Sequence, residues 1–451
     1  MARKKKENLS SELPIITSEQ LLRKAVGQIS EEAYTYYGSY VNNFRAIANV
    51  SDGLKVSYKR LIYAATQYPK GKDIPTMDLI SSLSKWHPHG VTGCEDLNAN
   101  LVKSGVFSGH GFFGDIQIDG VVNPHAATRY TKNRLSDLYW SVIGDLVKEV
   151  PYIESPQGAM EPTYIPLALP LCLYLTNLVE GLGVGLRAKY PNFSPKSLYQ
   201  AYINNNPMLL EPNVNLIIDK ENSELDRLWK TGKGNIIYSY KISRQMSPDG
   251  KTEGILFEGD TGIFTPNLKK LNKLAEDGKV FIDDLTDLSG PKLFVGRIPG
   301  ARGITIDEIE SLCRKACYDN TTYSLNVTDG NTAFRIPLYD WIDYTYKNYI
   351  NLISQVNLKR IEKVKFDILV QEALPIISDY IINKNPKASD DELNKTLGIP
   401  LEIISSVMSK PISYLRKNKD TASRIKELKD KLKELKKFDP VSFTEDVINK
   451  L

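Results

Sequence analysis

Residues 86–131 read WHPHGVTGCEDLNANLVKSGVFSGHGFFGDIQIDGVVNPHAATRYT. A helix expected at about 76–86 stops at the first five of these residues. Thr92-Gly93-Cys94-Glu95 then has the Thr-x-x-Glu pattern of a capping box, which predicts that the next helix begins there. Short helices joined by a tight turn are typical of a helix-turn-helix or winged-helix unit. The glycine- and aromatic-rich residues 105–130 would form the wing.

The histidines of the chain gather in the same stretch. It contains all four, His87, His89, His110 and His125, and it ends beside Arg129-Tyr130. Each histidine alone would more often be structural than functional. A zinc site made of His87, His89 and Cys94 is an alternative, but it fits no common ligand spacing.

Residues 109–114, Gly-His-Gly-Phe-Phe-Gly, match the dinucleotide-binding pattern G-x-G-x-x-G literally. That pattern requires a strand before it, a helix after it and an acidic residue about twenty positions further on. Here a helix is expected before it, the residues after it look extended, and position 134 is an arginine. We therefore reject a dinucleotide site and expect the glycines to allow close approach of two backbones.

Tyr130 is the most unusual candidate for chemistry. A tyrosine hydroxyl, with a pKa of about 10, is ordinarily protonated at neutral pH. It becomes a nucleophile only when a base or a strong positive potential assists it. Arg129 and the upstream histidines are placed to do so, although a surface tyrosine beside an arginine is the commoner reading of such a pair.

The composition sets the frame for these motifs. A chain of 451 residues with 41% hydrophobic and 25% charged residues predicts a globular protein of two to four domains. The net charge of +4 permits nucleic-acid binding without arguing for it. No apolar run is long enough for a membrane span, and the basic N-terminus lacks a secretory pattern. Four cysteines make no disulfide framework, and Cys313 and Cys317 are expected as core thiols inside the cell.

The second half of the chain changes in character. Strands are expected within 236–240 and 293–295 and a helix near 305–318. Two later stretches then have apolar residues at coiled-coil spacing. Two long antiparallel helices with a small helical knob at the tip would result, with two amphipathic helices in a bundle as the alternative. The residues at this spacing are Ile342, Tyr346, Tyr349, Ile353, Val356, and Ile425, Leu428, Leu432, Leu435.

Five blocks between residues 45 and 185 resemble, in order and spacing, the gyrase A and topoisomerase IV ParC subunits of type IIA DNA topoisomerases. The chain resembles most the short phage-type breakage subunit. Three positions depart from the family pattern: Trp86 replaces a tyrosine, Lys59 replaces an arginine and Lys132 stands where an acidic residue is common. The blocks are Arg45-Ala46-Ile47 with 52–60, residues 86–90, residues 109–114, residues 126–131, and residues 177–185.

The resemblance implies an α+β multidomain fold. Residues 1–30 would be an N-terminal arm and 31–155 a winged-helix cleavage domain that carries the catalytic tyrosine. Residues 156–335 would be an α/β tower domain, and 336–451 a long antiparallel coiled coil with a helical C-gate that dimerises the chain.

It also implies a reaction and its residues. Tyr130 would attack a DNA phosphate and form a transient 5′-phosphotyrosyl link, with Arg129 and Arg45 stabilising charge on the phosphate oxygens. His89, with His87 as second candidate, would orient the reacting groups or accept a proton. Flanking DNA would be bound by Lys55, Lys59, Arg60 and Thr92, with Leu182 as a wedge between bases.

The remaining expectations concern partners. The chain shows no ATPase motif and no acidic metal-binding pattern, so ATP and most Mg²⁺ ligands are expected on a gyrase B-like partner, and no metal ligands here. The partners would be double-stranded DNA, a second copy of this chain and that gyrase B-like protein, in the cytoplasm of a bacterial or phage-infected cell.

The sequence ends at Leu451 without a DNA-wrapping domain, so relaxation and unlinking are expected rather than supercoiling. A non-catalytic winged-helix DNA-binding protein is the alternative. A tyrosine recombinase is disfavoured because its His-x-x-Arg motif is missing.

Overall fold

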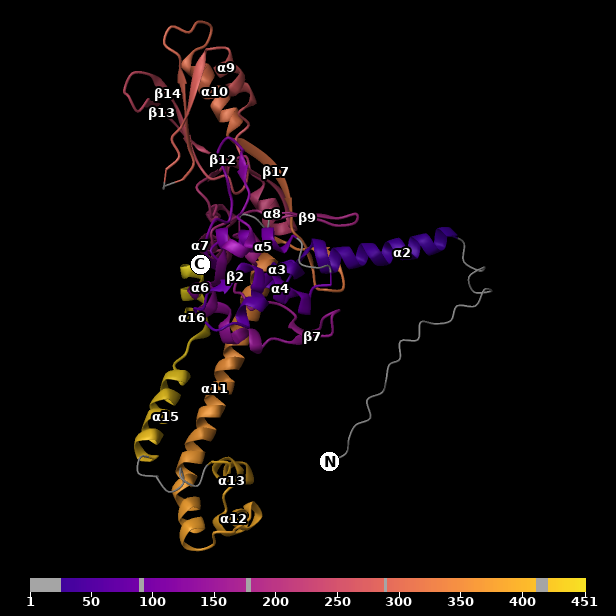
Figure 1. Cartoon of the computed structure of the whole chain (residues 1–451), viewed down its shortest axis with the longest axis vertical. Coiled ribbons are helices and arrows are strands. Elements are labelled where there is room, and N and C mark those ends of the chain that lie inside the picture. The colour runs from indigo at the N-terminus through magenta and orange to yellow at the C-terminus, as the bar shows by residue number, and fades with distance from the viewer. Residues whose placement is uncertain (1–25, 89–92, 176–179, 288–289, 411–420) are drawn as a thin grey trace.

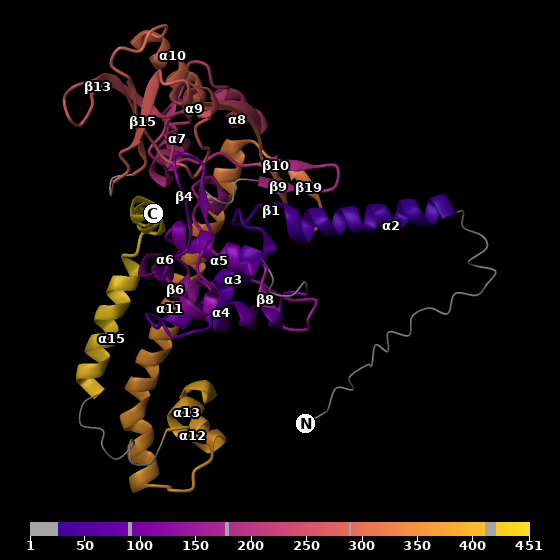
Figure 2. The same cartoon turned by 45° about the horizontal axis from the view of Figure 1, so that its top comes forward.

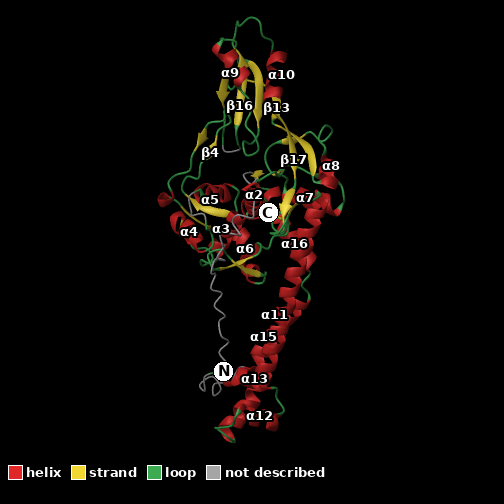
Figure 3. Ribbon diagram, turned by 90° about the vertical axis from the view of Figure 1, so that its right-hand side faces the viewer, coloured by secondary structure: helices red, strands yellow, loops and turns green. Residues whose placement is uncertain are grey.

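The chain has a mixed α+β architecture, as the sequence predicted. The computed structural model describes residues 26–88, 93–175, 180–287, 290–410 and 421–451 (Figure 1). A central body lies between a sheet-bearing lobe at one end and a long helical pair at the other (Figures 1 and 3). Among the described helices, none combines the length and apolar character that a membrane span requires.

The body begins with a projecting helix, α2 (Val26–Val41), which points away from the rest of the molecule (Figures 1 and 2). A π-helical turn, η1 (Asn42–Ala46), and strand β1 (Ala48–Asn49) follow it. The helix expected at about 76–86 is confirmed, and another helix precedes it. They are α3 (Val56–Thr66), then α4 (Thr76–Ser82) with η2 (Leu83–Lys85), before α5 (Cys94–Lys103).

The start of α5 differs from the predicted capping box. The N-cap is Gly93, in the left-handed region at φ 85°, without a side-chain cap. The expectation that Thr92 caps this helix with Glu95 at its third position is therefore wrong by one residue, and Thr92 itself lies outside the described residues. A glycine adopts this backbone conformation at little cost.

A three-stranded antiparallel sheet in the order β2-β6-β3 lies beside these helices, and the β4–β5 hairpin and the 3₁₀ turn η3 connect β3 to β6. Strand β3 precedes and overlaps the glycine block, where we expected a helix, but an extended segment follows it as predicted. The elements are β2 (Ile74–Pro75), β3 (Phe107–His110), β4 (Asp115–Ile116), β5 (Val122–Asn123), η3 (Thr128–Tyr130) and β6 (Lys132–Leu135).

Short elements complete the body. Strands β7 and β8 form an antiparallel hairpin, and so do β9 and β10. Their bounds, with the neighbouring helices, are α6 (Asp137–Ile143), η4 (Gly144–Lys148), β7 (Tyr152–Glu154), β8 (Met160–Pro162), η5 (Leu171–Leu173), β9 (Glu180–Leu182) and β10 (Arg187–Lys189).

Two larger sheets build the upper part of the molecule. A five-stranded sheet has the order β11-β12-β17-β10-β9, and an antiparallel four-stranded sheet has the order β13-β14-β16-β15. The expected strands at 236–240 and 293–295 and the helix near 305–318 are confirmed, and Cys313 and Cys317 are buried free thiols. The elements are α7 (Pro195–Ile203), η6 (Pro207–Leu209), β11 (Ile217–Ile218), α8 (Leu225–Thr231), β12 (Lys233–Ser239), β13 (Lys241–Met246), β14 (Glu253–Glu258), α9 (Lys269–Glu276), β15 (Val280–Asp284), β16 (Lys292–Arg297), α10 (Ile306–Ala316) and β17 (Tyr318–Ser324).

The first and last parts of the body are joined by another three-stranded sheet, in the order β1-β18-β19. Strand β1 pairs in parallel with β18 (Asn326–Thr328), which pairs in turn with β19 (Ala333–Arg335). The indole Nε1 of Trp341 donates to the carbonyl of Val50 at 2.8 Å. These bonds cross the predicted boundaries at 155 and 335, because residues far apart in sequence share one core.

A long helix, α11 (Leu338–Asn383), leads out of the body, and α15 (Thr421–Lys436) returns beside it (Figure 3). Their direction is antiparallel, because Asn357 bonds the carbonyl of Leu435 while Glu372 pairs with Lys429. Helices α12 (Asp390–Leu397) and α13 (Leu401–Met408) form a small core with the far end of α11. Helix α16 (Pro440–Lys450) closes the chain against the body.

The first apolar stripe has a different partner from the one expected. Tyr346 stacks near Tyr199 of α7, and the hydroxyl of Tyr349 donates to the carbonyl of Val142. The upper part of this stripe therefore packs on the body and not on the second helix, since periodicity specifies a buried face but not what covers it. The stripe of α15, from Ile425 to Leu435, is half-buried.

Candidate active site

Tyr130 lies on the surface at the end of the turn η3. Its side chain is 70% exposed, which is unusual for so large an aromatic group. The guanidinium carbon of the exposed Arg129 lies 4.8 Å from the centre of the tyrosine ring. A cation at this distance is attracted to the ring face and places positive charge beside the hydroxyl-bearing side chain. The pair predicted from sequence is thus a contact in space.

The residue after Tyr130 holds this exposed turn in place. Thr131 is buried; its hydroxyl donates to the hydroxyl of Thr76 at 2.8 Å, and its carbonyl accepts from the Thr76 amide at 3.0 Å. Thr76 begins α4, and Thr131 leads into β6, the central strand of its sheet. Tyr130 is therefore an exposed side chain on a backbone that is fixed from one side.

The glycine block lies against the same segment. A Cβ added at Gly111 would meet the Cγ2 of Thr131 at 2.8 Å, and one added at Gly114 would meet the carbonyl of Asn123 at 2.9 Å. Both glycines have positive φ, at 115° and 82°. The expectation that these glycines permit close approach of two backbones is confirmed.

The histidines have separate surroundings. The Nε2 of His110 lies 3.3 Å from a carboxylate oxygen of Asp73, which also binds Arg134 at 2.6 Å. The hydrogen bond from Arg134 lowers the pKa of Asp73. His125 lies 3.3 Å from Asp96. His87 lies 3.2 Å from a guanidinium nitrogen of Arg60, and His89 lies outside the described residues.

Arg45 and Leu182 lie on two elements that pack closely on each other. A Cβ at Gly181 would meet the carbonyl of Ala46 at 2.2 Å, so only glycine allows the β9–β10 hairpin to pack so closely on η1. The side chain of Asn42 then bonds both the amide and the carbonyl of Val184, at 2.8 and 3.1 Å. Arg45 is exposed on η1 and Leu182 is 69% exposed on the hairpin. Both predicted DNA contacts are therefore accessible on adjoining elements.

Lys55 is only half-buried, and its ammonium donates to the carbonyl of Glu180 in β9 at 2.6 Å. Burial lowers the pKa of Lys55. Lys55 therefore connects the start of α3 to the β9–β10 hairpin, and its positive charge lies beside that hairpin.

Lys59 and Arg60 require a correction. Each is only 5% exposed, and both bind Glu161: Arg60 through two hydrogen bonds of 2.8 Å and Lys59 at 3.5 Å. The ammonium of Lys59 also donates to the carbonyl of Pro162 at 2.9 Å. A cavity of about 810 Å³ reaches this cluster, but the charged atoms are already bound within the protein. The expectation that these two side chains hold DNA phosphates does not fit their burial.

Asp52 has a structural role in this arrangement. Its two carboxylate oxygens accept from the amides of Leu54 and Ile165 at 2.8 and 2.9 Å. Burial raises its pKa to about 7. The following Gly53 has φ 71°, and a Cβ there would meet the amide nitrogen of Leu171 at 2.7 Å. The Asp-Gly pair thus fastens the start of α3 to residues 165–171.

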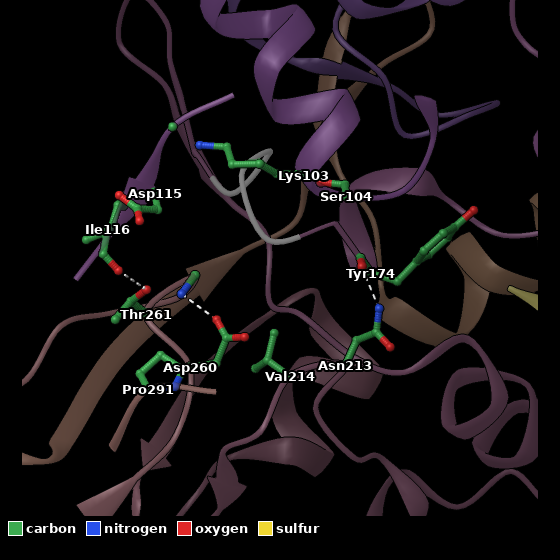
Figure 4. Close-up of a pocket in the computed structure, with 12 residues that line it drawn as sticks. Lys103, Ser104, Asp115, Ile116, Tyr174, Asn213, Val214, Asp260, Thr261 and Pro291 are labelled. Carbon is green, nitrogen blue, oxygen red and sulfur yellow. Dashed lines mark hydrogen bonds between the residues drawn. The ribbon is translucent and has the colours of Figure 1, made fainter. Parts of the chain in front are cut away.

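A cavity of about 440 Å³ lies where the body meets the upper lobe (Figure 4). The hydroxyl of Thr261 donates to the carbonyl of Ile116 at 2.9 Å, and Asn213 donates to the carbonyl of Tyr174 at 2.9 Å. We interpret this cavity as part of the interface between the body and the upper lobe, because its hydrogen bonds connect the β4–β5 hairpin and the body to the lobe.

Within the described ranges, no group of three or more His, Cys, Asp and Glu side chains is arranged to hold a metal ion. Asp73 is already bound by Arg134 and His110, so the chemistry of its surroundings does not fit a magnesium site. Of the residues in the zinc alternative, Cys94 is a buried thiol whose pKa is raised by burial, and His89 lies outside the described residues.

Sequence reasoning missed Glu161 and the Thr76–Thr131 pair. Its partner Arg60 lies 101 residues away in sequence, and no local pattern marks Glu161. Its only signal in the sequence is its position in a segment rich in proline and glycine.

The sequence of this chain is similar to those of a known protein family. A family model that describes the A subunits of DNA gyrase and topoisomerase IV matches residues 45–450. The chain is 29% identical over 261 residues to the DNA gyrase A subunit of Mycoplasma pneumoniae, which covers 51% of this chain and 30% of the relative. It is 26% identical over 394 residues to the DNA topoisomerase 4 A subunit of Borreliella burgdorferi, which covers 86% of this chain and 54% of the relative. The chain thus spans about half or less of the length of these relatives. Since the family match extends over most of its residues, the chain belongs to the family of DNA gyrase and topoisomerase IV A subunits.

Proposed function

We propose that this chain is the breakage-rejoining subunit of an ATP-dependent type IIA DNA topoisomerase, with Tyr130 as its nucleophile. One observation carries the proposal: the exposed Tyr130 stands on a fixed turn with the Arg129 guanidinium against its ring, within the span that matches the family.

The reaction is a transesterification, in which a phosphodiester bond of the DNA is exchanged for a phosphodiester bond to tyrosine. The Tyr130 hydroxyl oxygen attacks a phosphorus atom of the DNA backbone, the 3′-oxygen leaves with a proton, and the 5′-phosphate becomes esterified to tyrosine. The reverse attack by the 3′-hydroxyl restores the strand without an external energy source. Arg129 and Arg45 would stabilise the charge on the phosphate oxygens in the transition state.

We propose the division expected from the sequence, with the hydrogen bonds that cross its boundaries at 155 and 335 joining neighbouring domains. We assign α3, α4 and α5 with the β2-β6-β3 sheet to a winged-helix cleavage domain at 31–155, after an N-terminal arm at 1–30. The two larger sheets belong to the tower, 156–335, and helices α11 to α16 to the coiled coil and C-gate, 336–451. Leu182 would be the wedge between bases, and Lys55 a phosphate contact at the same hairpin; Thr92 and His89 stay predictions for residues outside those described.

The remaining components are assigned to partners. A gyrase B-like protein would hydrolyse ATP and hold most of the Mg²⁺ that assists phosphate chemistry. Because one tyrosine cuts one strand, two copies of this chain would make a double-strand break in duplex DNA. The setting would be the cytoplasm of a bacterial or phage-infected cell, with relaxation or decatenation as the outcome.

The test is covalent trapping on plasmid DNA. The wild-type chain or Tyr130→Phe is incubated with supercoiled plasmid, Mg²⁺ and a candidate gyrase B-like ATPase, then denatured. We expect DNA-linked protein with the wild type only, while Tyr130→Phe binds DNA within about twofold of wild type, since it loses only the hydroxyl. Adducts formed by Tyr130→Phe would refute the assignment of the nucleophile. The absence of adducts with either chain would favour a non-catalytic DNA-binding protein.

A further inference from the structure

A buried charged cluster connects the β7–β8 hairpin to the histidine-containing turn. Glu161, at 2% exposure, binds the guanidinium of Arg60 with both carboxylate oxygens at 2.8 Å. The remaining terminal nitrogen of Arg60 lies 3.2 Å from Nδ1 of His87. The planar guanidinium of Arg60 therefore binds a carboxylate on one side and an imidazole on the other. Its several N–H donors, which point in different directions in one plane, are suited to this arrangement.

The direction of the Arg60–His87 hydrogen bond follows from its chemistry. A guanidinium has donors only, so Nδ1 of His87 must be the acceptor and carry no proton. A neutral imidazole with a bare Nδ1 has its proton on Nε2. His87 in this arrangement is the Nε2–H tautomer, which offers a hydrogen-bond donor at Nε2.

A second contact holds the same turn on the same hairpin. The indole Nε1 of Trp86 donates to the carbonyl of Met160 at 3.0 Å. The ring of Tyr63 packs edge-on against Trp86 at 5.1 Å and lies 6.0 Å from the ring of Tyr152. Trp86 is thus bound to β8 directly, and His87 is bound to it through Arg60. The β7–β8 hairpin therefore fixes both the backbone of the turn and the ring of His87.

We propose that Glu161 is a positioning residue that, through Arg60, holds His87 as the Nε2–H tautomer, so that His87 acts as a hydrogen-bond donor and not as a proton acceptor. The donor role toward a DNA phosphate oxygen rests on the proposed function; the tautomer does not. Arg60 would therefore orient His87, whereas the sequence had led us to expect that it binds a DNA phosphate itself.

The tautomer is read directly by nitrogen NMR. The chain contains four histidines, so labelling histidine rings with ¹⁵N gives few signals, and His87→Gln identifies those of His87. In the full-length wild type at neutral pH we expect a bare Nδ1 and a protonated Nε2. A protonated Nδ1 in the wild type would overturn the proposal without any variant.

Two substitutions test the role of Glu161. Glu161→Gln keeps the size but loses the charge, and we expect the His87 signals to move toward the average of exchanging tautomers. If this variant does not fold, Arg60→Lys serves instead, because one ammonium cannot span both Glu161 and His87 as the fork does. Unchanged His87 signals in the folded variant would overturn the positioning role. Glu310→Gln, which removes a carboxylate bound to Arg244 and Arg314 in the upper lobe, is the matched control and should leave these signals unmoved.

Cleavage assays separate a donor from a proton acceptor. Glutamine carries an amide donor near the place of Nε2 but is not basic, so His87→Gln should retain more DNA cleavage than His87→Ala, which has no side-chain donor. General acid–base catalysis typically contributes about 10²–10⁴-fold, so a loss of that size in His87→Gln would contradict the donor role. If the wild type itself forms no adduct, the proposed function fails while the tautomer remains measurable.

Discussion

At the scale of single residues, the polar and charged groups of the candidate site and its surroundings divide into an exposed set and an interior set. Arg129, Tyr130 and Arg45 are exposed, whereas Asp52 and Glu161 are fully enclosed. Burying an ion pair is costly unless its hydrogen bonds are complete, and removing one partner typically costs about 3–5 kcal/mol. The interior set therefore shapes the site, and substitutions there should act on stability as well as on cleavage.

Asp52 predicts a measurable pH dependence of stability. Burial raises its pKa from 3.8 to about 7, so the folded state holds the proton more tightly than the unfolded chain. The resulting stabilisation is complete below the unfolded pKa and is lost as the pH rises through about 7, and it amounts to roughly 4 kcal/mol at most. In urea unfolding from pH 4 to 8, the wild type should lose stability relative to Asp52→Asn as the pH rises.

The control for this series is Asp226→Asn, at an exposed ion pair on α8. Its difference from the wild type should be nearly flat with pH. If the curve of Asp52→Asn also runs parallel to that of the wild type, Asp52 does not titrate in this range.

At the scale of elements, the β9–β10 hairpin and η1 show how small residues build a site. Gly181 and Gly183 have no side chain where Ala46 and Asn42 approach. Leu182, between them, is consequently presented to solvent beside the segment that carries Arg45. The hairpin and the π-helical turn are thus a single unit in packing, although 142 residues separate the bonded pair Asn42 and Val184.

Gly181→Ala should disrupt this unit. The added Cβ would meet the backbone carbonyl of Ala46 at 2.2 Å, so the hairpin must move. We expect a loss of about 1–3 kcal/mol in unfolding free energy, as is typical of overpacking, with at least a tenfold loss of cleavage because Leu182 shifts from Arg45. Denaturant unfolding and covalent trapping measure the two effects.

Gly27→Ala is the matched control, since nothing lies within 4 Å of its added Cβ on the projecting α2. There the substitution should stabilise the helix by about 0.5–1 kcal/mol and leave cleavage unchanged. Equal cleavage by Gly181→Ala and the wild type would show that the packing of the hairpin is unimportant to the reaction.

The sequence predicted local elements well and their partners poorly. The helix at about 76–86, the strand at 236–240 and the extended segment after the glycines follow from patterns within a few residues. The burial of Lys59 and Arg60 does not, because it depends on Glu161 about a hundred residues away. In the same way, the stripe from Ile342 to Tyr349 was identified as buried, but its partner is the body. The exposure of Tyr130 is set by Thr131 and Thr76, a pair without any signature in sequence.

At the scale of the whole molecule, the far end of the helical pair presents apolar side chains to solvent. Leu369, Ile376 and Ile382 of α11 and Leu401 of α13 are between 44% and 53% exposed. Several such residues on one small knob are typical of a surface that meets another protein. A second copy of this chain would cover them and bring two tyrosines to one duplex.

We therefore expect a dimer by light scattering at micromolar concentration, and a shift toward monomer in Ile376→Asp, because a buried unpaired charge opposes association. Leu358→Asp, at a 59% exposed position nearer the body, should remain dimeric. Circular dichroism checks that both variants keep their helices. A monomeric wild type, or equal dissociation by both variants, would contradict dimerisation through the knob.

The length of α11 has a mechanical consequence. Its 46 residues make a rod of about 69 Å, held at the body by the bond from Trp341 to Val50 near the start of α3. Such a rod is a lever arm: a rotation of about 5° at the body would carry its far end through roughly 6 Å. Pro375, inside the helix close to that end, lacks the amide that would bond the preceding turn, and so supplies a point of lower bending stiffness. Small angular changes at the core would in this way be amplified along the rod and taken up as flexure beside the knob.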